Sequence, residues 1–159
     1  MAVFCMSLCS CSGPVPVDVV MAGNEVFFVL EKPMEIRSLW VAPYDPAAAG
    51  KELKPAWALR HDLTTDVKAR KYPKLKQLKY GQKFTEFPVV AGPEELKKNI
   101  EYIVGIEMGG KFAREIFILT EDNKVVMPRP AFARQKGRAY TVLADKDGNE
   151  KLLLVPAGK

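Results

Sequence analysis

The sequence contains few of the residues from which catalytic and metal sites are usually built. Its 159 residues include three cysteines and a single histidine, His61. A zinc site needs four ligands from cysteine, histidine or carboxylate, and His61 is far along the chain from the cysteines. A Ser-His-Asp triad would depend on the same histidine, and no Gly-x-Ser-x-Gly segment is present. We therefore expect no metal, no cofactor and no small-molecule substrate, and we predict that the protein is not an enzyme.

Long apolar runs are also missing. No run approaches the roughly 18 apolar residues of a membrane-spanning helix, so no such helix is expected. A composition of 48% hydrophobic and 27% charged residues is typical of a soluble globular domain and excludes a collagenous, coiled-coil or wholly disordered chain. The length suits one domain with a short tail.

All three cysteines, Cys5, Cys9 and Cys11, are in the first eleven residues. A disulfide framework would place cysteines throughout the fold, because it works by closing loops between distant segments. Residues 1–10 are apolar and small, as in the hydrophobic stretch of an export signal. The alternative is an apolar N-terminal strand whose cysteines are buried.

The tetrapeptide Leu8-Cys9-Ser10-Cys11 resembles the lipobox of bacterial lipoproteins, in which a leucine stands three positions before an invariant cysteine. The resemblance implies that Cys11 carries the lipid anchor and that Cys5 and Cys9 leave with the signal. The mature chain would then have no free thiol, which suits an oxidising compartment. It also implies attachment to the outer membrane, at the periplasmic face or the cell surface, so residues 1–14 are interpreted as signal remnant and tether.

From residue 15 to 127 the pattern predicts β-structure. Residues 17–22 and 25–30 read as two strands around a Gly23-Asn24 turn. Alternating segments with turn signals about every ten residues indicate an antiparallel β-sandwich. Pro88 marks an edge strand, since proline cannot donate to a ladder. A helix after Gly92 is an alternative, but Ile100, Tyr102 and Val104 keep a period of two. The further strands are expected at 34–41, 56–63, 75–80, 84–90, 100–106, 111–120 and 125–127.

Residues 128–159 form a basic C-terminal extension. Residues 140–143 and 152–155 flank an Asp-Gly turn, which predicts a hairpin or tail added to the sandwich.

The segment from Leu96 to Ile106 resembles the penultimate strand of fibronectin type III-like and immunoglobulin-like domains, in which a leucine precedes a tyrosine by six residues. The resemblance implies a Greek-key sandwich in which the Tyr102 hydroxyl bonds back to the backbone at a corner. It also implies that Trp40 is the early-strand tryptophan of the core. A different sandwich, such as a transthyretin-like one, is the alternative, and neither fold defines a function.

The formal charge of +5 is unevenly distributed. Residues 60–83 contain eight Lys or Arg against two Asp or Glu, and a second basic excess lies in 124–159. The mid-chain segment predicts a basic stripe for an anionic partner. The alternative is a solvated sheet edge whose lysines prevent aggregation. The predicted contact residues are Lys71, Lys74, Lys76, Lys79 and Tyr80.

Together these features predict a non-enzymatic exported lipoprotein, a binding or structural module of the bacterial envelope. Its partners would be the membrane, through the N-terminal lipid, and an envelope protein or an anionic envelope component. A related alternative is an accessory lipoprotein of a secretion machine or an immunity protein against a secreted toxin. A different alternative is a soluble cytoplasmic binder of nucleic acid or of an acidic protein. Nucleic acid is not the expected partner, because no nucleic-acid-binding motif is visible.

Overall fold

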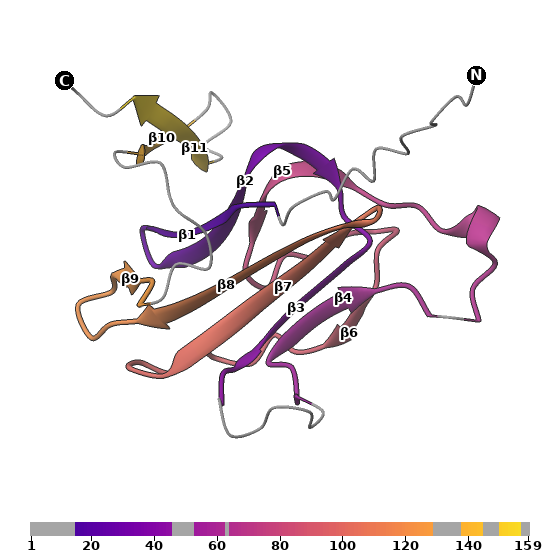
Figure 1. Ribbon diagram of the computed structural model, residues 1–159, viewed down its shortest axis with the longest axis horizontal. Coiled ribbons are helices and arrows are strands. Elements are labelled where there is room, and N and C mark those ends of the chain that lie inside the picture. Colours follow the sequence, from indigo (N-terminus) through magenta and orange to yellow (C-terminus); the bar gives the residue numbers. More distant parts are fainter. Residues whose placement is uncertain (1–14, 46–52, 63, 129–137, 145–149, 157–159) are drawn as a thin grey trace, which may run out of the picture.

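The computed structural model describes residues 15–45, 53–62, 64–128, 138–144 and 150–156, and the side chains of those up to residue 128. In this part of the chain two antiparallel sheets face each other across a shared apolar core (Figure 1). The predicted all-β, antiparallel β-sandwich is confirmed. Apart from a short 3₁₀ turn at Val67–Ala69, the described regular structure consists of strands.

The smaller sheet has three strands in the order β1-β2-β5. β1 (Val17–Ala22) and β2 (Glu25–Glu35) form the predicted hairpin, and Gly23 adopts a positive φ of 59° at its turn. β5 (Lys74–Lys79) pairs with the other side of β2. Because β5 is the last strand in this order, one of its edges has no strand partner among the described residues.

The larger sheet has six strands in the order β6-β4-β3-β7-β8-β9. β7 and β8 form its long central hairpin, closed by Gly109-Gly110, both with positive φ. Short strands, β6 and β9, lie at its two edges. The bounds are β3 (Ser38–Pro43), β4 (Trp57–Arg60), β6 (Val89–Ala91), β7 (Glu101–Met108), β8 (Lys111–Leu119) and β9 (Val125–Val126).

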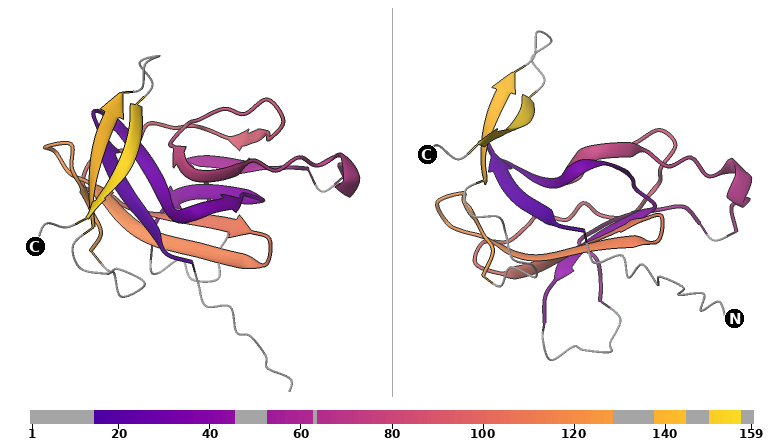
Figure 2. Two further views of the ribbon diagram at one scale, coloured as in Figure 1. Left: turned by 90° about the horizontal axis from the view of Figure 1, so that it is seen from above. Right: turned by 45° about the horizontal axis from the view of Figure 1, so that its top comes forward.

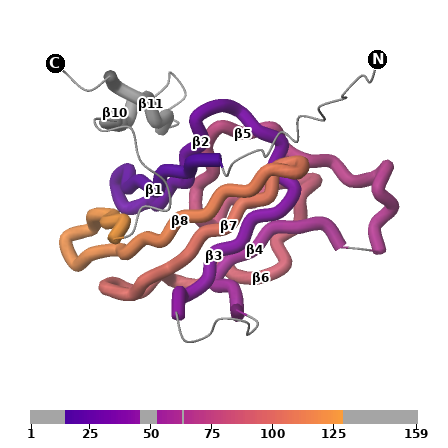
Figure 3. Tube along the Cα trace, viewed as in Figure 1, coloured from indigo at the N-terminus to yellow at the C-terminus, as the bar shows by residue number. Residues whose placement is uncertain are grey.

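The chain passes between the two sheets three times before it completes the larger one. It leaves β2 for β3, returns from β4 to β5, and crosses again from β5 to β6, as the traces in Figures 2 and 3 show. The first crossing corrects the prediction of one strand over 34–41. β2 continues to Glu35 and β3 begins at Ser38, so Ile36 and Arg37 form the link between sheets. Ile36 is fully buried at this crossing, whereas Ser38 and Trp40, two and four residues further on, are only partly buried, so the alternation of a single strand does not continue through the link.

The core lies between the sheets and takes alternate residues from their facing strands. Phe28 of β2, Trp57 of β4 and Phe117 of β8 are almost completely buried there, and their rings are in contact. A second, smaller cluster lies on the opposite face of the three-stranded sheet and contains Ala22, Phe27 and Val29.

The expected strand over 84–90 is largely wrong. Only Val89–Ala91 forms a strand, and it lies at the sheet edge next to β4. The preceding residues instead pack on the core, where Phe87 is buried and Phe84 is partly buried. Pro88 supplies a carbonyl to the Arg60 N–H but has no N–H of its own, so the strand starts after it.

Beyond the sandwich, β10 (Arg138–Ala144) and β11 (Glu150–Pro156) pair with each other as an antiparallel hairpin. Neither strand joins one of the two larger sheets.

Candidate functional site

The basic stripe forms the free edge of the three-stranded sheet. Lys74 and Lys76 lie on β5 itself and are exposed to solvent. Within the described residues neither of them forms an ion pair. These two ammonium groups are the charges of the stripe that are most available to a partner.

Lys71 and Lys79 lie on either side of this pair, and each contacts a carboxylate. Lys71 pairs with Glu86 of the segment before β6, and Lys79 pairs with Glu25 of β2 at 2.8 Å. The four side chains are between 41% and 69% exposed, so these ion pairs are screened by water and contribute little to stability. Along the sequence, the two lysines without an ion pair, Lys74 and Lys76, therefore stand between two paired lysines, of which Lys79 lies on β5 and Lys71 precedes it.

Tyr80, predicted as a contact residue, is half-buried, and both its ring and its hydroxyl contact other parts of the protein. Its ring packs edge-on against Trp57, with 5.2 Å between the ring centroids. Its hydroxyl donates a hydrogen bond to the carbonyl oxygen of Glu94 at 2.7 Å. Burial, with smaller contributions from Tyr102 and Glu94, raises the pKa of the Tyr80 hydroxyl well above its usual value. The Tyr80 side chain is therefore less available to a partner than the exposed lysines of β5.

Tyr102 is buried on β7, and its hydroxyl accepts a hydrogen bond from the backbone N–H of Lys97 at 3.0 Å. The bond spans five residues and ties the start of β7 to the loop that precedes it, as a tyrosine corner does. Leu96, next to this loop, packs partly on the core. The tyrosine stacks on Phe117 of β8, with 5.8 Å between ring centroids.

The expectation for the core tryptophan is wrong. Trp57, not Trp40, is the fully buried tryptophan. Along β3, Leu39 and Val41 point into the core, so Trp40 between them must point to the outer face of the larger sheet. There the Arg114 guanidinium lies over the Trp40 ring at 6.0 Å.

This outer face is a feature that the sequence analysis missed. The Arg114 guanidinium also lies 4.6 Å above the Phe112 ring, so one cation is placed over two aromatic side chains, one from β3 and one from β8, the strands on either side of β7. The period-two pattern of β8 could have indicated it, since Phe112, Arg114 and Ile116 share a face.

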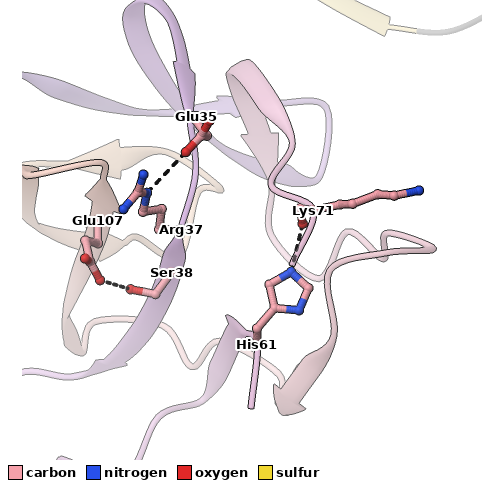
Figure 4. A network of polar contacts seen from close by, with 6 residues as sticks. All are labelled: Glu35, Arg37, Ser38, His61, Lys71 and Glu107. Atoms are coloured by element: carbon pink, nitrogen blue, oxygen red, sulfur yellow. Dashed lines mark hydrogen bonds and ion pairs between the residues drawn. The ribbon is translucent and has the colours of Figure 1, made fainter. Parts of the chain in front are cut away.

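His61 lies just after β4 and is held by its neighbours. Its Nε2 is 2.8 Å from the backbone carbonyl oxygen of Lys71, so this nitrogen carries the proton and donates it (Figure 4). The imidazole packs against the rings of Tyr72 and Phe87, at centroid distances of 5.1 and 5.6 Å. The position of the His61 ring is therefore explained by aromatic packing and by one hydrogen bond to the backbone.

A short polar network lies beside the link between β2 and β3. Arg37 Nε donates to Glu35 Oε1 at 3.1 Å, and Ser38 Oγ donates to Glu107 Oε2 at 3.2 Å (Figure 4). The Arg37 guanidinium also lies 5.5 Å from the Tyr72 ring centroid. These contacts fasten the β2–β3 link to the larger sheet and to the segment that leads into β5.

Cys11, the predicted lipidation site, lies outside the described residues, as do Cys5 and Cys9. Across the described ranges there is no group of three or more His, Cys, Asp or Glu that could hold a metal ion. No helix among those residues is long and apolar enough to cross a membrane. Comparison of the chain with family models, with curated proteins and with solved structures found no match.

Proposed function

We propose that the protein is a non-enzymatic binding module of the bacterial envelope, exported as a lipoprotein and tethered to the outer membrane through Cys11. The β-sandwich holds the edge strand β5 in place, and this edge meets an anionic envelope partner. The observation that carries the proposal is the position of Lys74 and Lys76, exposed and without ion pairs among the described residues, on an edge with no strand partner.

The family resemblance supports the same reading of the fold. The strand orders β1-β2-β5 and β4-β3-β7-β8, and the hydroxyl of Tyr102 on the backbone of Lys97, suit a fibronectin type III-like Greek key. In such a sandwich the loops and edges are free to bind, while the core is occupied by packing.

The anchor is tested by the intact mass of the mature protein, expressed with its own upstream DNA and taken from bacterial membranes. We expect an N-terminal Cys11 that carries two or three acyl chains. An unmodified chain that starts at Met1 and stays in the soluble fraction would overturn the lipoprotein assignment and favour the soluble alternative.

The basic edge is tested separately, by binding of the full chain to anionic vesicles and to envelope extract. Binding should weaken between low and physiological salt, because exposed charges are screened over about 10 Å at 0.1 M ionic strength. Charge reversal at Lys74 and Lys76 should abolish it. A binding affinity that changes neither with salt concentration nor with these two substitutions would overturn the proposal for the edge.

A further inference from the structure

We propose that the partner at this edge is an extended acidic protein segment that adds to β5 as a further strand. This inference rests on the proposed function and names the chemical class of its partner. It depends on two properties that coincide on β5, namely outward-facing backbone groups and unpaired lysines.

The direction of the backbone groups follows from the antiparallel ladder. The Tyr80 N–H donates to the carbonyl of Val26, so that pair is hydrogen-bonded, and so is every second pair along the strand. Lys79 and Gln77 fall at the alternate positions, opposite Phe27 and Val29, and turn their N–H and C=O groups away from β2.

The same reasoning applies at the start of β5, where the register has shifted. The Ile36 N–H donates to the carbonyl of Pro73, which makes the next pair, Lys74 opposite Glu35, an outward-facing one. Lys74 and Gln77 therefore both present backbone groups to the free edge.

One end of this edge is already closed. The Lys79 N–H donates to Gln82 Oε1 at 3.1 Å, and the Gln82 N–H donates to the Lys79 carbonyl at 3.0 Å. These bonds confirm that the Lys79 groups point outward, and they end the open edge before Lys79. The open part of β5 is therefore Lys74–Gln77, where no described residue supplies a backbone partner.

The other edge strands of the sandwich are less suited to the addition of a further strand. β6 has three residues and β9 has two, and β1 lies beside β8 and β9. Among the described edge strands of the two larger sheets, β5 and β1 are the longest, at six residues each, and only β1 has strands of the other sheet packed beside it. Strand addition at such an edge is a common mode of peptide recognition, in which backbone bonds give affinity and alternate side chains give specificity.

The positive charge of the β5 lysines indicates which kind of segment would pair with this edge. In a second copy of this chain, β5 would bring Lys74 and Lys76 against lysines, and like charges on paired strands repel. A strand with carboxylates at alternate positions would instead meet opposite charges on one face. A lipid head group would pair with the lysine charges but would not form a ladder of hydrogen bonds with the backbone N–H and C=O groups between them. The coincidence of both features favours an acidic polypeptide over a membrane surface.

The test measures binding of the full chain to a labelled peptide of alternating glutamate and valine, about eight residues long to match a strand. A second peptide with the same sequence carries N-methyl groups on the amides of one edge and keeps its charge. Anionic phospholipid vesicles serve as the third probe. We expect the unmodified peptide to bind at least ~10-fold more tightly than the N-methylated one, the loss expected from removing about two hydrogen bonds.

Two pairs of variants address the protein side. Gln77→Pro removes an outward N–H without changing charge, and Gln77→Ala is its control. A proline is tolerated on an edge strand where its N–H would face solvent. Lys74→Glu with Lys76→Glu reverses the edge charge, and Lys97→Glu with Lys111→Glu makes the same change in net charge elsewhere. Only Gln77→Pro and the β5 charge reversal should weaken peptide binding, and the N-methyl comparison still decides if Gln77→Pro does not fold.

The outcomes separate this inference from the proposed function. Strand addition would be overturned if the protein bound the two peptides equally, or if it bound the vesicles but not the unmodified peptide. In either case the proposal of an anionic partner would still hold. If neither peptide nor vesicles bind the wild-type chain in a salt-dependent way, the proposed edge function fails as well. Equal loss in the Lys97 and Lys111 control would show a net-charge effect and would also overturn the inference.

Discussion

Trp40 lies directly over Gly105 on the outer face of the larger sheet. The two residues are partners across β3 and β7, and a Cβ added at Gly105 would lie 2.4 Å from the Trp40 indole atom Cε2. The indole occupies the space that any other side chain at position 105 would need. Glycine at this position therefore allows the partly buried indole to lie close against the backbone of β7.

Gly105→Ala should destabilise the protein by about 1–3 kcal/mol, because the indole or the strand must move to admit the methyl group. The effect is measured as the change in free energy of unfolding by urea. Made in a Trp40→Ala background, the same substitution should cost little, since the obstructing ring is gone. An equal cost in both backgrounds would show that the Trp40 contact is not the reason for the glycine.

Tyr102→Phe should lower the free energy of unfolding by about 1–3 kcal/mol, because the Lys97 N–H loses its acceptor at a half-buried site. Tyr72→Phe is the matched control, since no hydrogen bond of the Tyr72 hydroxyl is found among the described residues, and its effect should stay within about 0.5 kcal/mol. Identical melting curves for wild type and Tyr102→Phe would remove the tyrosine corner as support for the fibronectin-like resemblance.

The raised pKa of Tyr80 predicts that stability falls at high pH. The unfolded chain releases this proton near pH 10, whereas the folded chain retains it to higher pH, so alkali favours unfolding. The contribution is fully present below pH 10 and is lost as the pH rises toward the folded-state pKa.

This pH dependence is measured by urea unfolding at a series of pH values from 9 to 11, for wild type and Tyr80→Phe. The variant should be less stable at pH 9, because it lacks the bond to Glu94, and its stability should fall less steeply above pH 10. Parallel curves for the two proteins would contradict the assignment to Tyr80.

The exposed lysines of β5 should be dispensable for folding. Lys74→Gln and Lys76→Gln are each expected to change the free energy of unfolding by no more than about 0.5 kcal/mol. A double-mutant cycle on Lys79 and Glu25 should give a coupling of about 0.2–1 kcal/mol that decreases with salt. A larger, salt-independent cost at Lys74 or Lys76 would mean that these residues stabilise the fold, and binding losses in their variants would then be ambiguous.

Strand positions were largely determined by the sequence where alternation and turn residues agree. The β1–β2 hairpin follows from apolar alternation on both sides of Gly23, and the β7–β8 hairpin from Gly109-Gly110, whose positive φ angles ordinary residues adopt at a cost. Both signals are local, so they survive without knowledge of the rest of the chain.

Only the tertiary structure decided which face of each strand meets the other sheet. Alternation placed Trp40 and Leu39 on opposite faces of one segment, but it could not say which face is the core, and Trp57 fills that position. The crossing at Ile36–Arg37 could not be recognised from the sequence, because an apolar residue followed by a charged one continues the alternation that is typical of a strand.

Some properties of the candidate site also follow from the sequence alone, and others depend on the tertiary structure. The sequence by itself determined that basic residues are concentrated in residues 60–83. It could not determine that β5 is the last strand of its sheet, that Lys71 and Lys79 have carboxylate partners, or that Tyr80 is turned inward to Glu94. Those properties depend on strand order and on contacts between segments distant in sequence, which arise only when the two sheets pack.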